Sequence, residues 1–571
     1  MKLGNPRAKT CFAILMVLPI CTNVLAQSTN RQVGTQFTVT ADPLVPRPHT
    51  PSCVVTLFQN YQFALFSETA QTFSFTPPAN CPGPYNQVVL DIDFSENAGS
   101  QFDRTASIYL GNTNIYFGTT PEPLSNATNS WHLERDITDY GALLASPQQG
   151  TMILQNCTGQ DCGSAFSFLN GVFTVTAKLE LFPAPGHSPA PRTPDMVLPI
   201  EQFNSSGGLN LPAILSTPTD TFATTFNLPT NIEGAYLDIV AQSQQEDEQW
   251  YACFPNDLTS INDLFGCGNT DFREGEVTID GQLAGIAPVS PWVFTGFLPD
   301  QWQPIPAVQT LDFVPFRVNL TPFASLLSDG TPHTIAVDVF DRNFSTPSIS
   351  SFFSMSSSLL LFLDHGSPEV TGALTKNTLA EPSPVESENL TPITQSPVTG
   401  TVAVTAKRSF SISGFVNTSH GKVTTTIAQQ REFSSNQAID FDTVAFSVLN
   451  QSLSLTNQLV SSTTVHSNDG VQVTQQKYSF PVTVNVAFPV SNSTFGFTAA
   501  TTQNYEASKL VMRNGQVEDF SSATNFATAS DVLPPSSAQH YTSVSLNGPA
   551  YDCEISTANN TLTTVSKGCT H

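Results

Sequence analysis

Apolar and polar residues alternate with a period of two in many short segments of this 571-residue chain. Examples are residues 88–94, 173–181 and 482–488, in which every second residue is apolar. Such alternation is typical of half-buried β-strands, because successive side chains point to opposite faces of a sheet. Helical periodicity is nearly absent, and Asp280–Gly281 lies between two short apolar segments, as in a tight hairpin turn. Since 42 prolines and 32 glycines also punctuate the chain, the sequence predicts an all-β fold of antiparallel sandwiches.

Two stretches of biased composition divide the chain into blocks. Residues 182–194 are rich in proline, and residues 366–400 are rich in Pro, Ser, Thr and Glu, so both are predicted to be linkers. A chain of this length is also too long for one hydrophobic core. We predict sandwich domains at 40–183 and 195–365 and a β-rich accessory domain at 401–571, which lacks tryptophan and is rich in Ser, Thr, Asn and Gln.

Residues 1–26 have the pattern of a signal peptide. Three basic residues precede an apolar run at 12–20, and the Val-Leu-Ala sequence at 24–26 fits a cleavage site. The apolar run is well short of the roughly 20 residues that a membrane-spanning helix needs. The protein is therefore predicted to be secreted, either extracellular or periplasmic.

Eight of the ten cysteines lie beyond this leader, and an even number in an exported chain indicates disulfide bonds. Spacing alone does not establish the pairing, but proximity in the sequence favours four short-range bonds. No cysteine or histidine spacing resembles a zinc site, so no metal is predicted. The favoured pairs are Cys53–Cys81, Cys157–Cys162, Cys253–Cys267 and Cys553–Cys569.

The chain is strongly acidic, with 46 Asp and Glu against 21 Lys and Arg and a formal net charge of −25. A surface of this sign repels nucleic acid and anionic membranes, so neither is predicted as a partner. A neutral ligand is compatible with it.

Tryptophans and clustered carboxylates suggest a carbohydrate site in the first two blocks. Tryptophan faces stack on sugar rings, although each could equally belong to the core. Carboxylates group near 91–103, 134–139 and 246–248, and close carboxylates raise one another's pKa, although most such groups are solvated surfaces. Residue patterns alone leave a carbohydrate-binding adhesin and a polysaccharide glycoside hydrolase open. The tryptophans are Trp131, Trp250, Trp292 and Trp302.

Longer motifs narrow these alternatives. The segments 101–110, 131–140, 246–251 and 413–416, in their order and spacing, resemble the peptide:N-glycosidase A (PNGase A) family, and the likeness extends over about residues 40–430. A more distant likeness is to bacterial PNGase F, which implies two jelly-roll domains packed side by side with the site at their interface. The resemblance implies an amidase that acts on N-glycosylated peptides or proteins, releases the intact glycan as a glycosylamine and converts Asn to Asp, without a cofactor.

The resemblance also implies site residues. Asp103 matches the catalytic aspartate, and Arg104 beside it is predicted to orient that carboxylate or tune its pKa. Glu248 is the second catalytic candidate, while Glu246 and Asp247 are close rivals that we assign to substrate binding. The tryptophans Trp131, Trp250, Trp292 and Trp302 are assigned to substrate binding as well.

One departure from PNGase F puts a site of three carboxylates in doubt. A third acidic residue of PNGase F falls near Gln155–Asn156, where this chain has no acid. The alternative interpretation of Asp103–Arg104, without the resemblance, is a surface pair on a strand.

Overall fold

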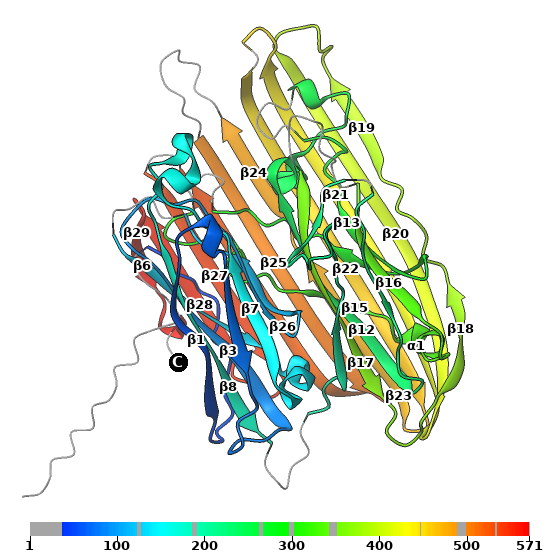
Figure 1. The fold of residues 1–571 in the computed structure, drawn as a ribbon. Helices are drawn as coiled ribbons and strands as arrows, with labels where there is room; N and C mark the ends of the chain where they lie inside the picture. Colours follow the sequence, from blue (N-terminus) through cyan, green and yellow to red (C-terminus); the bar gives the residue numbers. More distant parts are fainter. Residues whose placement is uncertain are drawn as a thin grey trace, which may run out of the picture.

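Antiparallel strands form nearly all the regular structure in the parts of the chain that the structure, a computed structural model, describes. The predicted leader lies outside these parts, and the one α-helix among them is the short α1 (Ala324–Leu327). Figure 1 shows strands of three groups that follow one another along the chain. The all-β prediction is confirmed. The described residues are 37–122, 127–184, 191–217, 219–261, 267–295, 302–341, 351–445, 447–487, 498–531 and 534–569.

The first group is a sandwich of two four-stranded sheets. Its strands alternate buried and partly exposed residues, as the period-two pattern predicts, and the apolar faces meet in a common core. One sheet has the order β1 (Cys53–Phe63), β8 (Phe173–Pro183), β3 (Tyr85–Glu96) and β6 (Asn129–Asp136). The other has the order β2 (Ala70–Phe75), β7 (Gln148–Leu154), β4 (Thr105–Leu110) and β5 (Thr113–Thr119).

The second group repeats this strand order, which is that of a jelly roll, with an additional strand β9 (Met196–Pro199) on β17. Its hairpin β13–β14 turns at Asp280 and Gly281, both with positive φ, as the sequence predicts. One sheet has the order β10 (Ala213–Leu215), β17 (Phe352–Leu363), β12 (Ile232–Gln244) and β15 (Phe316–Asn319). The other has the order β11 (Phe222–Phe226), β16 (His333–Phe340), β13 (Glu274–Ile279) and β14 (Gln282–Pro288).

The third group is a single 12-stranded sheet of long strands, which runs along the second sandwich in Figure 1. Hydrogen bonds join most strands to the next one along the chain. The strands are β18 (Thr371–Asn377), β19 (Val385–Leu390), β20 (Val398–Thr418), β21 (Gly421–Asp442), β22 (Ser447–Ser467), β23 (Gly470–Ser479), β24 (Val482–Ala487), β25 (Thr498–Arg513), β26 (Gln516–Ser530), β27 (Ser536–Ser545), β28 (Tyr551–Ala558) and β29 (Thr561–Val565).

The linker predicted at 366–400 is therefore wrong in part, because β18 and β19 lie within it. Both pair with β20, which has 21 residues and is long enough to hold the two short strands end to end. Their side chains are mostly exposed, so a polar composition that looks like a linker suits an edge strand equally well.

The two sandwiches meet where the segment after β14 passes along β5. Phe313 donates its backbone N–H to Phe117 O at 2.8 Å, and Thr119 donates to Thr310 O at 2.8 Å. Gly118 lies between these contacts, and a Cβ atom there would be 2.2 Å from the carbonyl oxygen of Leu311. Only glycine permits this close approach of two backbones.

The third sheet shares a core with the second sandwich. The rings of Phe433 and Phe272 lie 5.1 Å apart, and Asn457 donates its side-chain N–H to Val289 O at 2.8 Å. Fully buried Glu274 forms ion pairs with Arg408 and Arg431 of β20 and β21. The C-terminal unit is therefore more than the accessory domain that the sequence predicts. Apolar residues of the second sandwich and of the third sheet pack in one cluster.

All four predicted disulfides are confirmed: Cys53–Cys81, Cys157–Cys162, Cys253–Cys267 and Cys553–Cys569. Each closes a short loop, and the sequence separations of the bonded cysteines are 5 to 28. Among the residues that the structure describes, no helix is long and apolar enough to span a membrane.

Candidate active site

A hairpin of the first sandwich brings two carboxyl groups to one end. Asp103 lies just before β4, and Glu122 lies just after β5. The pairing continues past the strands, since Thr120 donates its backbone N–H to Arg104 O and Arg104 donates to Thr120 Oγ1, both at 2.9 Å. The two acids are therefore close, and the charge of Asp103 contributes to the raised pKa of Glu122.

A third carboxyl group comes from the second sandwich. β12 ends at Gln244, and Glu248 lies in the 3₁₀ segment η5 (Gln245–Ala252) that follows. The end of β12 contacts the start of β4, where Gln242 Nε2 donates to Thr105 Oγ1 at 3.0 Å. This contact places Glu248 within electrostatic reach of Asp103 and of Glu122.

Burial is the main influence on the acidity of this cluster. It raises the pKa of Glu248 to about 8, with the charge of Asp103 as the next contribution. It also raises the pKa of Glu122 to about 8, where Asp103 adds to the effect and Arg104 opposes it. Glu96, at the end of β3, has a pKa of about 8 because of burial and the neighbouring Glu122. Below that pH these three carboxyls hold protons beside the carboxylate of Asp103.

Arg104 is held next to the cluster by neighbours of its own. Its Nη2 donates to Gln101 Oε1 at 2.7 Å and lies 3.7 Å from Cys157 Sγ, while its guanidinium carbon is 5.7 Å from the centre of the Phe102 ring. Burial lowers the pKa of Arg104, whereas Asp103 and Glu122 act in the opposite direction. A fixed positive charge therefore accompanies the acids.

Comparison with known proteins places this arrangement in a family. A family model described as Peptide N-acetyl-beta-D-glucosaminyl asparaginase amidase A matches residues 43–380, which include both sandwiches and all the acids above. The chain belongs to the PNGase A family.

Two known proteins are similar to this chain. Peptide-N4-(N-acetyl-beta-glucosaminyl)asparagine amidase A of Prunus dulcis is 28% identical over 427 residues, which are 69% of this chain and 68% of that protein. The solved structure of PNGF-II is 14% identical, with a TM-score of 0.38 over 55% of this chain; the match spans 65% of the length of the PNGF-II chain.

The four tryptophans assigned to substrate binding are core residues in this PNGase A family member. Their exposed fractions are 5% for Trp131, 0% for Trp250, 3% for Trp292 and 1% for Trp302. Other rings cover their faces: Trp131 stacks on Phe94 at 5.1 Å, and Trp292 stacks on Phe313 at 4.0 Å. The prediction that they present a face to sugar is wrong, because their side chains point inward from the strands and loops that carry them and pack in the cores.

Asp247 is also misassigned as a substrate-binding residue. Its side chain is fully buried and forms an ion pair with Arg273, equally buried, at 3.0 Å. Neighbouring residues of a 3₁₀ turn point in different directions, so Asp247 is buried in the core while Glu248 lies within electrostatic reach of Asp103. Glu246 is half-buried, and its substrate-binding role stays a prediction.

Glu122 is the residue that sequence reasoning missed. The expected third acid at Gln155–Asn156 is replaced by an amide with a structural role: Asn156 is buried and donates to Phe63 O and Gly171 O at 2.9 and 3.0 Å. The signal for Glu122 was its place in the Pro-Glu-Pro sequence at 121–123, between the segments 101–110 and 131–140 that resemble the family.

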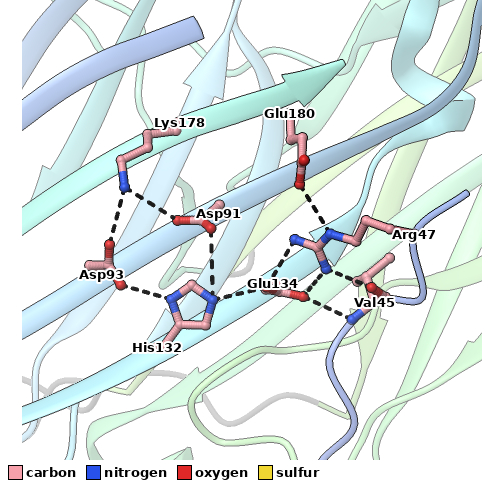
Figure 2. Close-up of polar contacts among 8 residues, drawn as sticks. All are labelled: Val45, Arg47, Asp91, Asp93, His132, Glu134, Lys178 and Glu180. Carbon is pink, nitrogen blue, oxygen red and sulfur yellow. Dashed lines mark hydrogen bonds and ion pairs between the residues drawn. The ribbon is translucent and has the colours of Figure 1, made fainter. Parts of the chain in front are cut away.

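One further group has the composition of a metal site. Asp91 and Asp93 of β3 and His132 of β6 offer ligand atoms that all lie within 4.8 Å of one another. His132 uses both ring nitrogens, Nδ1 with Asp93 at 2.8 Å and Nε2 with Glu134 at 3.0 Å. Lys178 Nζ lies 3.4 Å from Asp93 and 3.9 Å from Asp91 (Figure 2).

The positive charges in this group argue for an ion network. Burial lowers the pKa of His132, but its hydrogen bonds to Asp93 and Glu134 outweigh this and raise the pKa to about 9. Arg47 forms ion pairs with Glu134 and Glu180 at the other end of the group (Figure 2). The positive charges of His132, Lys178 and Arg47 therefore already balance the carboxylates that a metal ion would need as ligands.

Proposed function

We propose that this protein is a glycoamidase that hydrolyses the amide bond between an asparagine side chain and N-acetylglucosamine. The products are the intact N-glycan as a glycosylamine and an aspartate in the peptide. The observation that carries the proposal is the meeting of Asp103, Glu122 and Glu248, from two sandwiches, in a chain of the PNGase A family.

The chemistry needs a base and an acid. Asp103 accepts a proton from a bound water, whose oxygen attacks the amide carbon. The C–N bond then breaks, and the departing nitrogen takes a proton from Glu248, which holds one below about pH 8. Burial and the charge of Asp103 support this division of roles, because both oppose loss of that proton. Arg104 orients the Asp103 carboxylate.

We further propose that the sandwiches at 40–183 and 195–365 form the catalytic unit and that residues from 371 onward stabilise it. Secretion is supported by the leader pattern at 1–26 and by the four disulfides, which persist in oxidising compartments.

Mass spectrometry of a glycopeptide after incubation tests the proposal. A glycoamidase leaves aspartate in the peptide and releases the whole glycan. A glycoside hydrolase would leave N-acetylglucosamine on asparagine, and an adhesin would leave the glycopeptide intact. Either of the last two results would overturn the proposal.

A further inference from the structure

Three phenylalanines form an exposed cluster beside the acids. Phe102 directly precedes Asp103, and its ring contacts those of Phe166 and Phe168 at 5.6 and 6.3 Å between centres. Phe166 is 47% exposed and Phe168 is 59% exposed. Exposed apolar rings that adjoin a reactive site are typical of a binding surface.

The loop that carries two of these rings is held in place. The Cys157–Cys162 disulfide closes its first part, which contains η3 (Gly159–Cys162). Gly159 donates its backbone N–H to Leu169 O at 2.7 Å, and buried Gln101 donates its side-chain N–H to Cys157 O at 3.0 Å. The rings are therefore presented to solvent by a rigid support, which reduces the entropy lost on binding.

The geometry of the rings favours an apolar side chain over a sugar. Phe102 is inclined by 78° to Phe166 and by 90° to Phe168, and these two are inclined by 58° to each other. A sugar ring stacks on one flat aromatic face and uses polar groups at the ring edge. Rings at steep angles instead form a cup, and phenylalanine has no polar atom to offer to hydroxyl groups.

We propose that the cup of Phe102, Phe166 and Phe168 binds an apolar side chain of the substrate polypeptide, close in sequence to the glycosylated asparagine. The inference rests on the proposed amidase function, because only a peptide substrate brings such a side chain next to Asp103. It makes the cup a determinant of which glycosylation sites are cut.

Two glycopeptides test this proposal. They carry the same glycan and have the same length, but one has Leu and Phe beside the glycosylated Asn and the other has Ser and Gly. The wild-type protein is expected to cut the apolar peptide with a kcat/KM about 10-fold higher, mainly through a lower KM, as for one apolar side chain in a pocket. The double variant Phe166→Ser/Phe168→Ser is expected to cut both with equal kcat/KM.

Phe203→Ser is the matched control, since Phe203 is equally exposed at 59% but belongs to the loop after β9. It should keep the preference for the apolar peptide. Thermal unfolding of the double variant checks its fold, and the single variant Phe168→Ser provides the same comparison with a smaller change.

The outcomes separate this proposal from the function it rests on. Equal losses of kcat/KM on both peptides would mean that the rings bind the shared glycan, and no loss of preference would mean that they bind nothing; either result overturns the cup. Failure of the wild-type protein to convert Asn to Asp in either peptide would overturn the amidase function instead.

Discussion

Asp103 is the residue on which the proposed chemistry depends most. Asp103→Asn is nearly isosteric, so the fold and glycan binding should persist, but an amide cannot accept the proton of the attacking water. We expect kcat to fall by about 10²-fold to 10⁴-fold, which is the usual contribution of general acid–base catalysis. The measurement is kcat on a short glycopeptide, with circular dichroism as the check on folding. Retention of more than about a tenth of the wild-type kcat would remove Asp103 from the central role.

Glu248 should set the alkaline limit of activity. Because burial and Asp103 raise its pKa to about 8, it is protonated below that pH and loses its proton above it. We therefore expect kcat/KM to be maintained at neutral pH and to fall as pH rises through about 8.

The variant Glu248→Gln separates this acid from its neighbours. It should lower kcat by less than Asp103→Asn does and should remove the alkaline fall, because glutamine does not titrate. If the fall persists in Glu248→Gln but disappears in Glu122→Gln, the proton donor is Glu122, whose pKa lies in the same range.

At the scale of the strands, the ion network across β3, β6 and β8 should make stability depend on pH. His132 has a pKa of about 9 in the folded protein against about 6.5 when unfolded. A raised pKa means that its stabilisation is complete below the unfolded value and is lost as pH rises through about 9. His132→Gln should therefore cost about 2 kcal/mol near neutral pH and less at high pH.

Thermal unfolding of the wild-type and His132→Gln proteins across this range gives the measurement. Only the difference between the two proteins is used, since Glu96, Glu122 and Glu248 also lose protons near pH 8 and do so in both. A difference in Tm that does not change with pH would show that folding does not raise the pKa of His132.

At the scale of the whole molecule, the third sheet is expected to be necessary for folding. A chain that ends at residue 365 would expose Phe272 and leave the buried carboxylate of Glu274 without Arg408 and Arg431. Loss of a buried partner costs about 3–5 kcal/mol, a large part of the stability of a domain. We expect the truncated protein to lack a cooperative unfolding transition, whereas a folded and active 27–365 fragment would contradict the shared core.

A pair of substitutions isolates the same contact in the full-length chain. Arg431→Met should lower the free energy of unfolding by about 3–5 kcal/mol, because it leaves Glu274 partly unpaired. Lys407→Met breaks the exposed pair with Glu432 and should cost less than about 1 kcal/mol. Similar values for the two variants would indicate that the buried pair does not join the units.

The sequence by itself determined the features that depend on neighbours along the chain. Period-two alternation specified strands because side chains alternate across a sheet, and the Asp280–Gly281 turn followed from local backbone preference. The disulfides were found because each joins cysteines close in the sequence. Asp103 was predicted from a motif that is continuous in the sequence, and its catalytic role stays a prediction.

Only the tertiary structure decided which distant residues meet. Glu122 and Glu248 belong to different sandwiches and come together through the contact of β12 with β4, which no local pattern contains. Trp250 and Asp247 were wrongly assigned to the site because the sequence does not show which way the side chains of η5 point. That direction depends on the core around η5, where both residues have buried partners. The pKa values of the acids likewise arise from burial, and burial is a property of the assembled sandwiches and sheet.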